Sequence, residues 1–205
     1  MGVVRRMAAL VAVGSWSLAA HAMDQGGASQ PSRPPTPDTA AIREQMSPLA
    51  RLAGCWTGEG RMRVGPGEPK TAVGTEWLES RLDGTLVTVS GKFHTRLSDG
   101  SKGALIHEAF AVIVPAAEGG YRFLSYLASG MGADMRGDFR EGKFTWSPPV
   151  TQGRQIRYVA DWSVKDRWHE VGEYSADGVT WIQFLEMKLE RQNSSEACTA
   201  ARAGS

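Results

Sequence analysis

Closely spaced turn signals constrain this chain more than any other feature, because they leave room for strands but not for crossover helices. Asp83-Gly84, Asp99-Gly100 and Asp177-Gly178 each separate two apolar runs, which is the pattern of tight hairpins. About ten strands are predicted, over residues 55–64, 70–82, 85–97, 102–114, 121–128, 132–140, 143–147, 154–164, 167–175 and 180–191. This succession favours an all-β fold, an antiparallel up-and-down meander closing into a barrel.

The residues before the first strand divide into two segments. Residues 1–22 have the form of a secretory signal peptide: Arg5-Arg6, an apolar run, and the small-x-small sequence Ala20-His21-Ala22. The apolar run is short for a bilayer span, so cleavage after Ala22 is favoured over a membrane anchor. Residues 23–40 are rich in Pro, Gly and Ser, as in a disordered linker. We expect a periplasmic or secreted protein with a barrel domain over residues 41–192 and a flexible tail over 193–205.

The charge balance excludes some classes of partner. The chain has 205 residues, 41% of them hydrophobic, and a formal net charge of +1. Loss of Arg5 and Arg6 with the signal leaves slightly more acidic than basic residues, and neither sign is clustered. We therefore expect no nucleic-acid partner and no stable membrane insertion after cleavage. The oligomeric state stays open.

The two cysteines lie at the two ends of the predicted barrel. Cys55 opens the first strand and Cys198 follows the last one. With an even number of strands, the first and last strands pair antiparallel, which brings these ends together. An exported protein would then form a Cys55–Cys198 disulfide. Two unpaired thiols are the alternative, because a disulfide needs a short Cα separation.

Alternation along the strands predicts the side chains that point into the barrel. Residues 132–140 give the clearest case, with Ala133, Met135, Gly137 and Phe139 between charged residues. The interior is expected to be apolar and aromatic, with Thr75, Gln183 and Glu79 as its few polar groups. A barrel of this size favours an internal pocket, for a small apolar or amphipathic ligand held against Trp56, Trp77, Phe93, Met135, Tyr158, Trp162 and Trp181. The alternative is an interaction module whose barrel is filled by its own tryptophans.

Motifs for catalysis and metal binding are missing from the sequence. The spacing of His94, His107 and His169 does not suit zinc, so we predict no metal, no cofactor and no assigned catalytic residue. The best acid candidates are glutamates, because a buried carboxyl has a raised pKa and can act as a general acid or base: Glu76, Glu170, Glu173 and Glu186. The rival hypothesis is an isomerase or hydrolase that uses an interior Glu, Glu79 included, and His169.

Three stretches resemble known barrel families. Residues 49–60, with Gly54-x-Trp56-x-Gly58-x-Gly60, are similar to the first strand of calycin-type and nitrobindin-like barrels. Residues 82–86 and 168–187 resemble the DUF1579 family, which has no known activity. The resemblance implies a calycin-like barrel with a short helix, over Ala40 to Leu52, that caps one end. Nitrobindins bind haem through a late histidine, but no histidine lies on the final strand here, so the ligand is not carried over.

Overall fold

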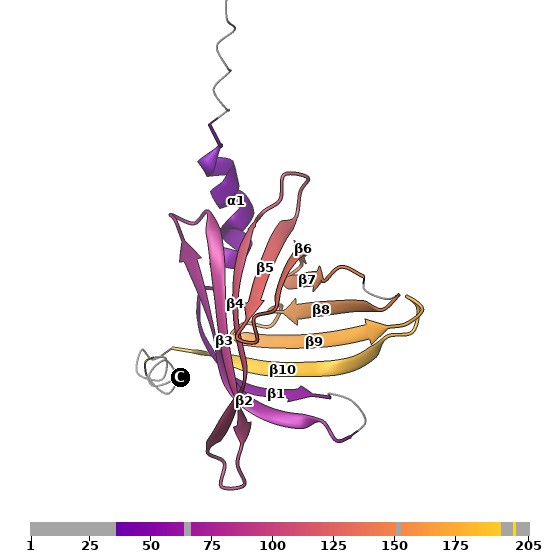
Figure 1. The fold of residues 1–205 in the computed structure, drawn as a ribbon. Helices are drawn as coiled ribbons and strands as arrows, with labels where there is room; N and C mark the ends of the chain where they lie inside the picture. Colours follow the sequence, from indigo (N-terminus) through magenta and orange to yellow (C-terminus); the bar gives the residue numbers. More distant parts are fainter. Residues whose placement is uncertain (1–35, 64–66, 151–152, 194–198, 200–205) are drawn as a thin grey trace, which may run out of the picture. The chain divides into compact units, whose positions relative to one another are not determined.

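A computed structural model describes residues 36–63, 67–150, 153–193 and 199. Its ten strands form a closed antiparallel barrel in which each strand pairs with its neighbours in sequence and the last strand pairs with the first (Figure 1). The strands are β1 (Gly54–Met62), β2 (Lys70–Arg81), β3 (Leu86–Arg96), β4 (Lys102–Pro115), β5 (Tyr121–Leu127), β6 (Gly132–Arg140), β7 (Lys143–Ser147), β8 (Gln155–Asp161), β9 (Arg167–Ser175) and β10 (Ile182–Gln192). The all-β meander predicted from the turn spacing is therefore confirmed.

One helix, α1 (Thr39–Ala50), precedes the strands, within two residues of the expected bounds. Asp38 caps its first turn by accepting hydrogen bonds from the backbone N–H groups of Ala40 and Ala41, at 3.0 and 3.1 Å. Pro48 does not break the helix. It lies in the last turn, where only one intrahelical hydrogen bond is lost.

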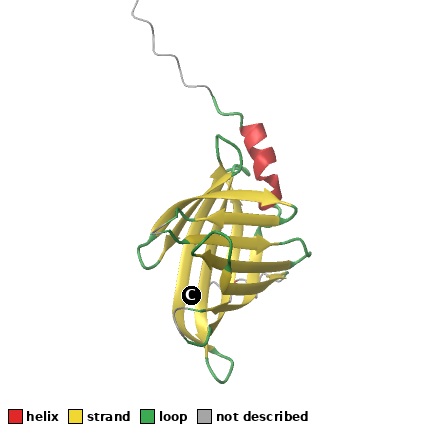
Figure 2. Cartoon of the chain, turned by 90° about the vertical axis from the view of Figure 1, so that its right-hand side faces the viewer, coloured by secondary structure: helices red, strands yellow, loops and turns green. Residues whose placement is uncertain are grey.

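The helix covers one end of the barrel (Figure 2). Its apolar side chains Met46 and Leu49 are fully buried in the core. Gln45 Nε2 donates to the carbonyl of Gly120 at 2.8 Å, and the hydroxyl of Tyr121 donates to the carbonyl of Gln45 at 2.8 Å. These contacts fix α1 against the turns at the end of the barrel where β2, β4, β6, β8 and β10 finish, which we call the helix end.

Inward-facing glycines let aromatic rings pack across the sheet. A Cβ on Gly74 of β2 would collide with the ring of Phe93 on β3, and one on Gly137 of β6 would collide with Phe144 on β7. Glycine within a strand commonly marks such a close approach. The interior is therefore filled in part by rings that lie over the backbone of a neighbouring strand.

Candidate functional site

The half of the interior next to α1 is closely packed. Its inward-facing side chains are almost completely buried: Trp56, Leu78, Val87, Ile113, Phe144, Ala160, Trp168 and Leu189. Trp168 links two other indoles, with ring centroids 6.0 Å from Trp56 and 4.8 Å from Trp162. We call this half of the interior the closed half.

The other half of the interior admits solvent. Its inward-facing side chains are Met62, Phe93, His107, Ser125, Leu127, Ala133, Ile156, Tyr158, Tyr174, Ile182 and Leu185, and most are half-buried or exposed. Tyr174 is 38% exposed and Ile182 is 48% exposed although both point inward from paired positions on β9 and β10. We call this region the open half, because its inward-facing side chains remain in contact with solvent.

Two carboxyl groups lie inside the barrel. Glu76 on β2 is 8% exposed and Glu170 on β9 is 9% exposed. Glu76 is paired with the buried Trp56 of β1, and Glu170 with the buried Met187 of β10. Side chains paired across neighbouring strands lie on the same face of the sheet, so both glutamates point into the barrel. We call Glu76 and Glu170 the carboxyl pair.

Burial controls the protonation of this pair. Loss of water raises the pKa of Glu170 to about 7, against a smaller opposing effect from the indole Nε1 of Trp168, which donates to Glu170 Oε2 at 3.2 Å. The pKa of Glu76 lies well above its usual value, first because of burial and second because of the negative charge of Glu170. Glu170 also raises the pKa of Tyr158, after the larger effect of burial. Glu76, Glu170 and Tyr158 therefore form one electrostatically coupled group in the interior.

Gly91 makes room for the carboxyl of Glu76. The two residues are paired across β2 and β3. A Cβ on Gly91 would collide with both carboxyl oxygens of Glu76. The Glu76 side chain therefore lies across the backbone of β3. None of the described residues donates a hydrogen bond to its carboxyl group.

Five of the seven residues expected to hold a ligand do point into the barrel. Trp56, Met135 and Trp162 belong to the closed half or pack against it, while Phe93 and Tyr158 line the open half. Tyr158 stacks on Trp146 with ring centroids 5.3 Å apart. The structure therefore places only Phe93, itself 5% exposed, and the half-buried Tyr158 of the expected set in the open half.

The expected inward orientation of Trp77 and Trp181 is wrong. Trp77 pairs with Cys55 and lies between the inward-facing Glu76 and Leu78, so it belongs to the outer face. A register shift between Gln183 and Leu185 of β10 adds one residue to that strand. After the bulge the odd-numbered residues of β10 point inward, whereas before it the even-numbered Ile182 does. Trp181 therefore lies outside, with the guanidinium carbon of Arg157 at 3.9 Å from its ring centroid.

The phase of β2 and the bulge of β10 also place the other polar groups that we expected in the interior on the outer face. Thr75 and Glu79 share the outer face with Trp77, and Gln183 shares it with Trp181. Glu173 bonds to Arg157 at 2.7 Å, and Glu186 lies 3.1 Å from His169 and 2.8 Å from Lys188. The isomerase or hydrolase hypothesis therefore finds no interior site in four of its candidate residues: Glu79, Glu173, Glu186 and His169.

Sequence reasoning missed one inward-facing histidine. His107 pairs with Phe93 across β3 and β4, with ring centroids 6.2 Å apart. Burial lowers its pKa, which favours the neutral imidazole. The only sequence signal was parity, since Ala109, Ala111 and Ile113 follow it at alternate positions. Cys55 is buried on the outer face; Cys198 lies outside the described residues, so the disulfide stays a prediction.

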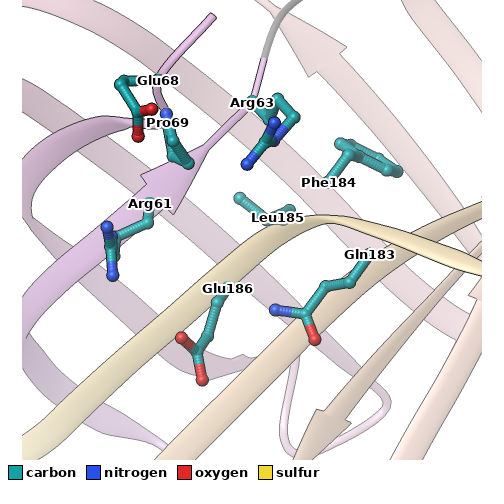
Figure 3. Close-up of a pocket in the computed structure, with 8 residues that line it drawn as sticks. All are labelled: Arg61, Arg63, Glu68, Pro69, Gln183, Phe184, Leu185 and Glu186. Carbon is teal, nitrogen blue, oxygen red and sulfur yellow. The ribbon is translucent and has the colours of Figure 1, made fainter.

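A surface hollow of about 330 Å³ lies at the rim of the open half, where β1 and β10 meet (Figure 3). The residues that line it are Arg61, Arg63, Glu68, Pro69, Gln183, Phe184, Leu185 and Glu186. The extra residue of the β10 bulge, Phe184, is one of them, and its ring lies 5.8 Å from that of Tyr158. The hollow therefore adjoins the aromatic wall of the open half.

Two further properties hold for the described part of the chain. It contains no cluster of three or more His, Cys, Asp or Glu side chains placed to hold a metal ion. No helix within it has the length and apolar character needed to cross a membrane.

Comparison with known proteins bears on the fold alone. No family model matches the chain, and no curated protein matches it either. Among solved structures, the crystal structure of Rv2717c from M. tuberculosis aligns with a TM-score of 0.51 and 14% identity, over 73% of this chain and 98% of that one. At this identity the likeness is one of barrel architecture, and the resemblance to the DUF1579 family stays a prediction.

Proposed function

We propose that the protein binds a small amphipathic molecule in the open half of its barrel. The observation that carries this proposal is the difference in burial between the two halves. Side chains that point inward are fully packed beside α1, whereas equivalent positions at the other end, such as Tyr174 and Ile182, remain exposed. A monomeric protein has no structural need to leave apolar inward-facing side chains in water.

The composition of the open half suits an amphipathic ligand. Phe93, Tyr158 and Phe184 provide aromatic surface, and the carboxyl pair provides polar groups deeper in the barrel. Small-molecule sites typically combine apolar walls with a few polar groups that fix orientation. A purely apolar ligand would leave the carboxyl pair without a hydrogen-bond partner, which is costly in a buried site.

We propose the same cellular location that the sequence suggests. Export with cleavage after Ala22 would place the barrel in the periplasm or outside the cell, where a carrier for an amphipathic molecule is useful. Residues 1–35 lie outside the described part of the chain, so this proposal rests on the sequence pattern alone.

Fluorescence titration with the apolar dye N-phenyl-1-naphthylamine tests the binding site. Ser125→Trp would place an indole at a half-buried inward position of the open half, and Tyr126→Trp places the same group on the adjacent outer position. We expect saturable binding by the natural chain, weakened at least about tenfold by Ser125→Trp and changed by less than about twofold by Tyr126→Trp. Absence of saturable binding, or equal effects of the two variants, would favour the filled interaction module instead.

A further inference from the structure

We propose that the carboxyl pair, Glu76 and Glu170, binds the protonated amine of a cationic amphipathic ligand whose apolar part occupies the open half. This inference rests on the binding function proposed above and assigns the chemical class of its ligand. It is argued from the position, burial and neighbours of the two carboxyl groups.

The inner and outer carboxylates differ in the partners that the protein gives them. On the outer face Glu59, Glu108, Asp134, Glu173 and Asp161 each lie against an Arg or Lys side chain. Inside, Trp168 donates one hydrogen bond to Glu170, and no described residue donates one to Glu76. A carboxyl that is more than nine-tenths buried and has no donor is expensive for a folded protein, so a donor from outside the chain is the natural complement.

In the described part of the chain, two basic side chains occupy inward-facing positions, Arg191 and His107, and neither neutralises the charge of the carboxyl pair. Arg191 is held at the helix end by Asp166 at 3.1 Å and by the carbonyl of Ala53 at 2.7 Å, and it stacks on Trp56 with its guanidinium carbon 4.3 Å from the ring centroid. His107 lies beside Phe93 and favours its neutral form.

The remaining groups around the pair carry no positive charge either. The inward-facing neighbours of the two glutamates on β1, β3, β8 and β10 are Trp56, Gly91, Ala160 and Met187. Tyr158, whose pKa is raised first by burial and second by Glu170, is the other titratable group that faces the pair. Negative charge on the pair is therefore uncompensated within the barrel.

An ammonium group fits this arrangement better than the other cations found in proteins. The charge of Glu170 acts on Glu76, so the two carboxyl groups interact inside the barrel, and the three N–H groups of one ammonium can donate to both. Zinc, calcium and magnesium require four or more ligands, and the described residues supply two carboxyl groups with no third His, Cys or acidic side chain in position. A ligand with an ammonium group and an apolar body would satisfy the carboxyl pair and the aromatic wall together.

Binding of such a ligand is coupled to release of a proton. The empty barrel retains a proton on the pair near neutral pH, because burial opposes ionisation of both groups. When the ammonium enters, it keeps its own protons, and a carboxyl proton leaves to the solvent. The affinity for the amine should therefore rise as the pH increases through about 7.

Two probes of nearly equal size separate the charge from the apolar body: 1-naphthylmethylamine, which is protonated, and 1-naphthalenemethanol, which is neutral. At about pH 8, where the pair ionises more readily, we expect the full chain to bind the amine about 10- to 100-fold more tightly than the alcohol. Isothermal titration in Tris and in phosphate buffer should show proton release with the amine alone. Glu170→Gln and Glu76→Gln should each weaken amine binding by about tenfold or more and should remove most of the preference for the amine over the alcohol.

Glu173→Gln is the matched control, because Glu173 lies on the same strand but on the outer face, with Arg157. Equal affinities for amine and alcohol, or an amine affinity that neither interior variant nor pH alters, would overturn the amine assignment while leaving the binding function intact. If the natural chain binds neither naphthyl probe and does not bind N-phenyl-1-naphthylamine, both proposals are overturned. The pH dependence of the natural chain needs no variant, so the test stands even if a Gln variant fails to fold.

Discussion

The two halves of the barrel are built from the same ten strands but differ in how closely their side chains are packed. In the closed half, α1 supplies Met46 and Leu49 to a core in which Trp56, Phe144 and Leu189 are almost completely buried. In the open half, inward-facing apolar side chains remain in contact with solvent. Since burial of apolar surface is the main source of stability, most of the stability must come from the closed half.

The carboxyl pair marks the boundary between these halves. Glu170 is flanked on β9 by Trp168, which belongs to the closed half, and by Gly172, whose missing side chain makes room for Tyr158 of the open half. Functional sites commonly carry groups that are unfavourable for stability. Mutations in the two halves should therefore affect stability and binding separately.

The largest effect is expected for Trp56→Ala. Removal of an indole that is 1% exposed should lower the free energy of unfolding by about 3–5 kcal/mol. Trp181→Ala is the matched control, because that indole lies outside and contacts Arg157; we expect a loss of less than about 1 kcal/mol. Urea denaturation followed by circular dichroism measures both, and equal losses would contradict the assignment of the two faces.

The second prediction concerns pH. The pKa of Glu170 in the folded protein is about 7, above its usual value of 4.5, so the folded protein holds a proton that the unfolded chain releases. The resulting stability is complete below about pH 4.5 and is lost as the pH rises through about 7. The total loss should be about 3 kcal/mol, and Glu76 acts in the same direction.

Glu170→Gln should reduce this loss of stability, because a neutral amide replaces the titrating group. Glu186→Gln is the control on the outer face, where Lys188 lowers the pKa of the carboxyl. Urea denaturation at several pH values between about 5 and 8 measures the slope. A natural chain whose stability is constant across this range would show that the carboxyl pair is not buried in the way described.

The third prediction compares two glycines of β6. A Cβ on Gly137 would collide with the ring of Phe144 in the closed half, so Gly137→Ala should cost about 1–3 kcal/mol through overpacking. Gly132, at the open end of the same strand, has its nearest side-chain atom at 3.2 Å from a Cβ and is exposed. Gly132→Ala should change stability by less than about 0.5 kcal/mol, and thermal unfolding of the two variants measures the difference.

Turn chemistry and alternation predict the strand order of this barrel and most of its inward-facing side chains, but not the phase of β2 or of the first residues of β10. Asp-Gly turns have a local geometry that depends on few residues, so the hairpins could be located from sequence. The interior row of β2 consists of Ala72, Gly74, Glu76 and Leu78, which looks like an outer face beside the bulky Trp77. Hydrophobicity therefore predicts the opposite phase for β2, and this prediction is wrong.

The carboxyl pair could be predicted only in part. Glu76 and Glu170 are two of the four glutamates that the sequence offers as acids, but the sequence does not show which of the four point into the barrel. Alternation with Leu185 and Met187 predicts the outer position of Glu186, which the register with β9 bears out; what the sequence does not show is the bulge before it, which reverses the phase of Trp181 and Gln183. A bulge adds one residue without a distinctive local signal here, and every side chain on one side of it changes face.

The sharpest test of the separation combines a small expected effect of Ile182→Ala on stability with a loss of binding. Ile182 points inward at the rim of the open half but is 48% exposed, so its removal should cost less than about 1 kcal/mol. Leu189→Ala on the same strand, in the closed half, should cost about 2–5 kcal/mol. If the open half binds ligand, Ile182→Ala should nevertheless weaken binding of N-phenyl-1-naphthylamine, while Leu189→Ala should leave the affinity of the remaining folded protein within about twofold. The reverse pattern would mean that ligands enter the barrel through the helix end.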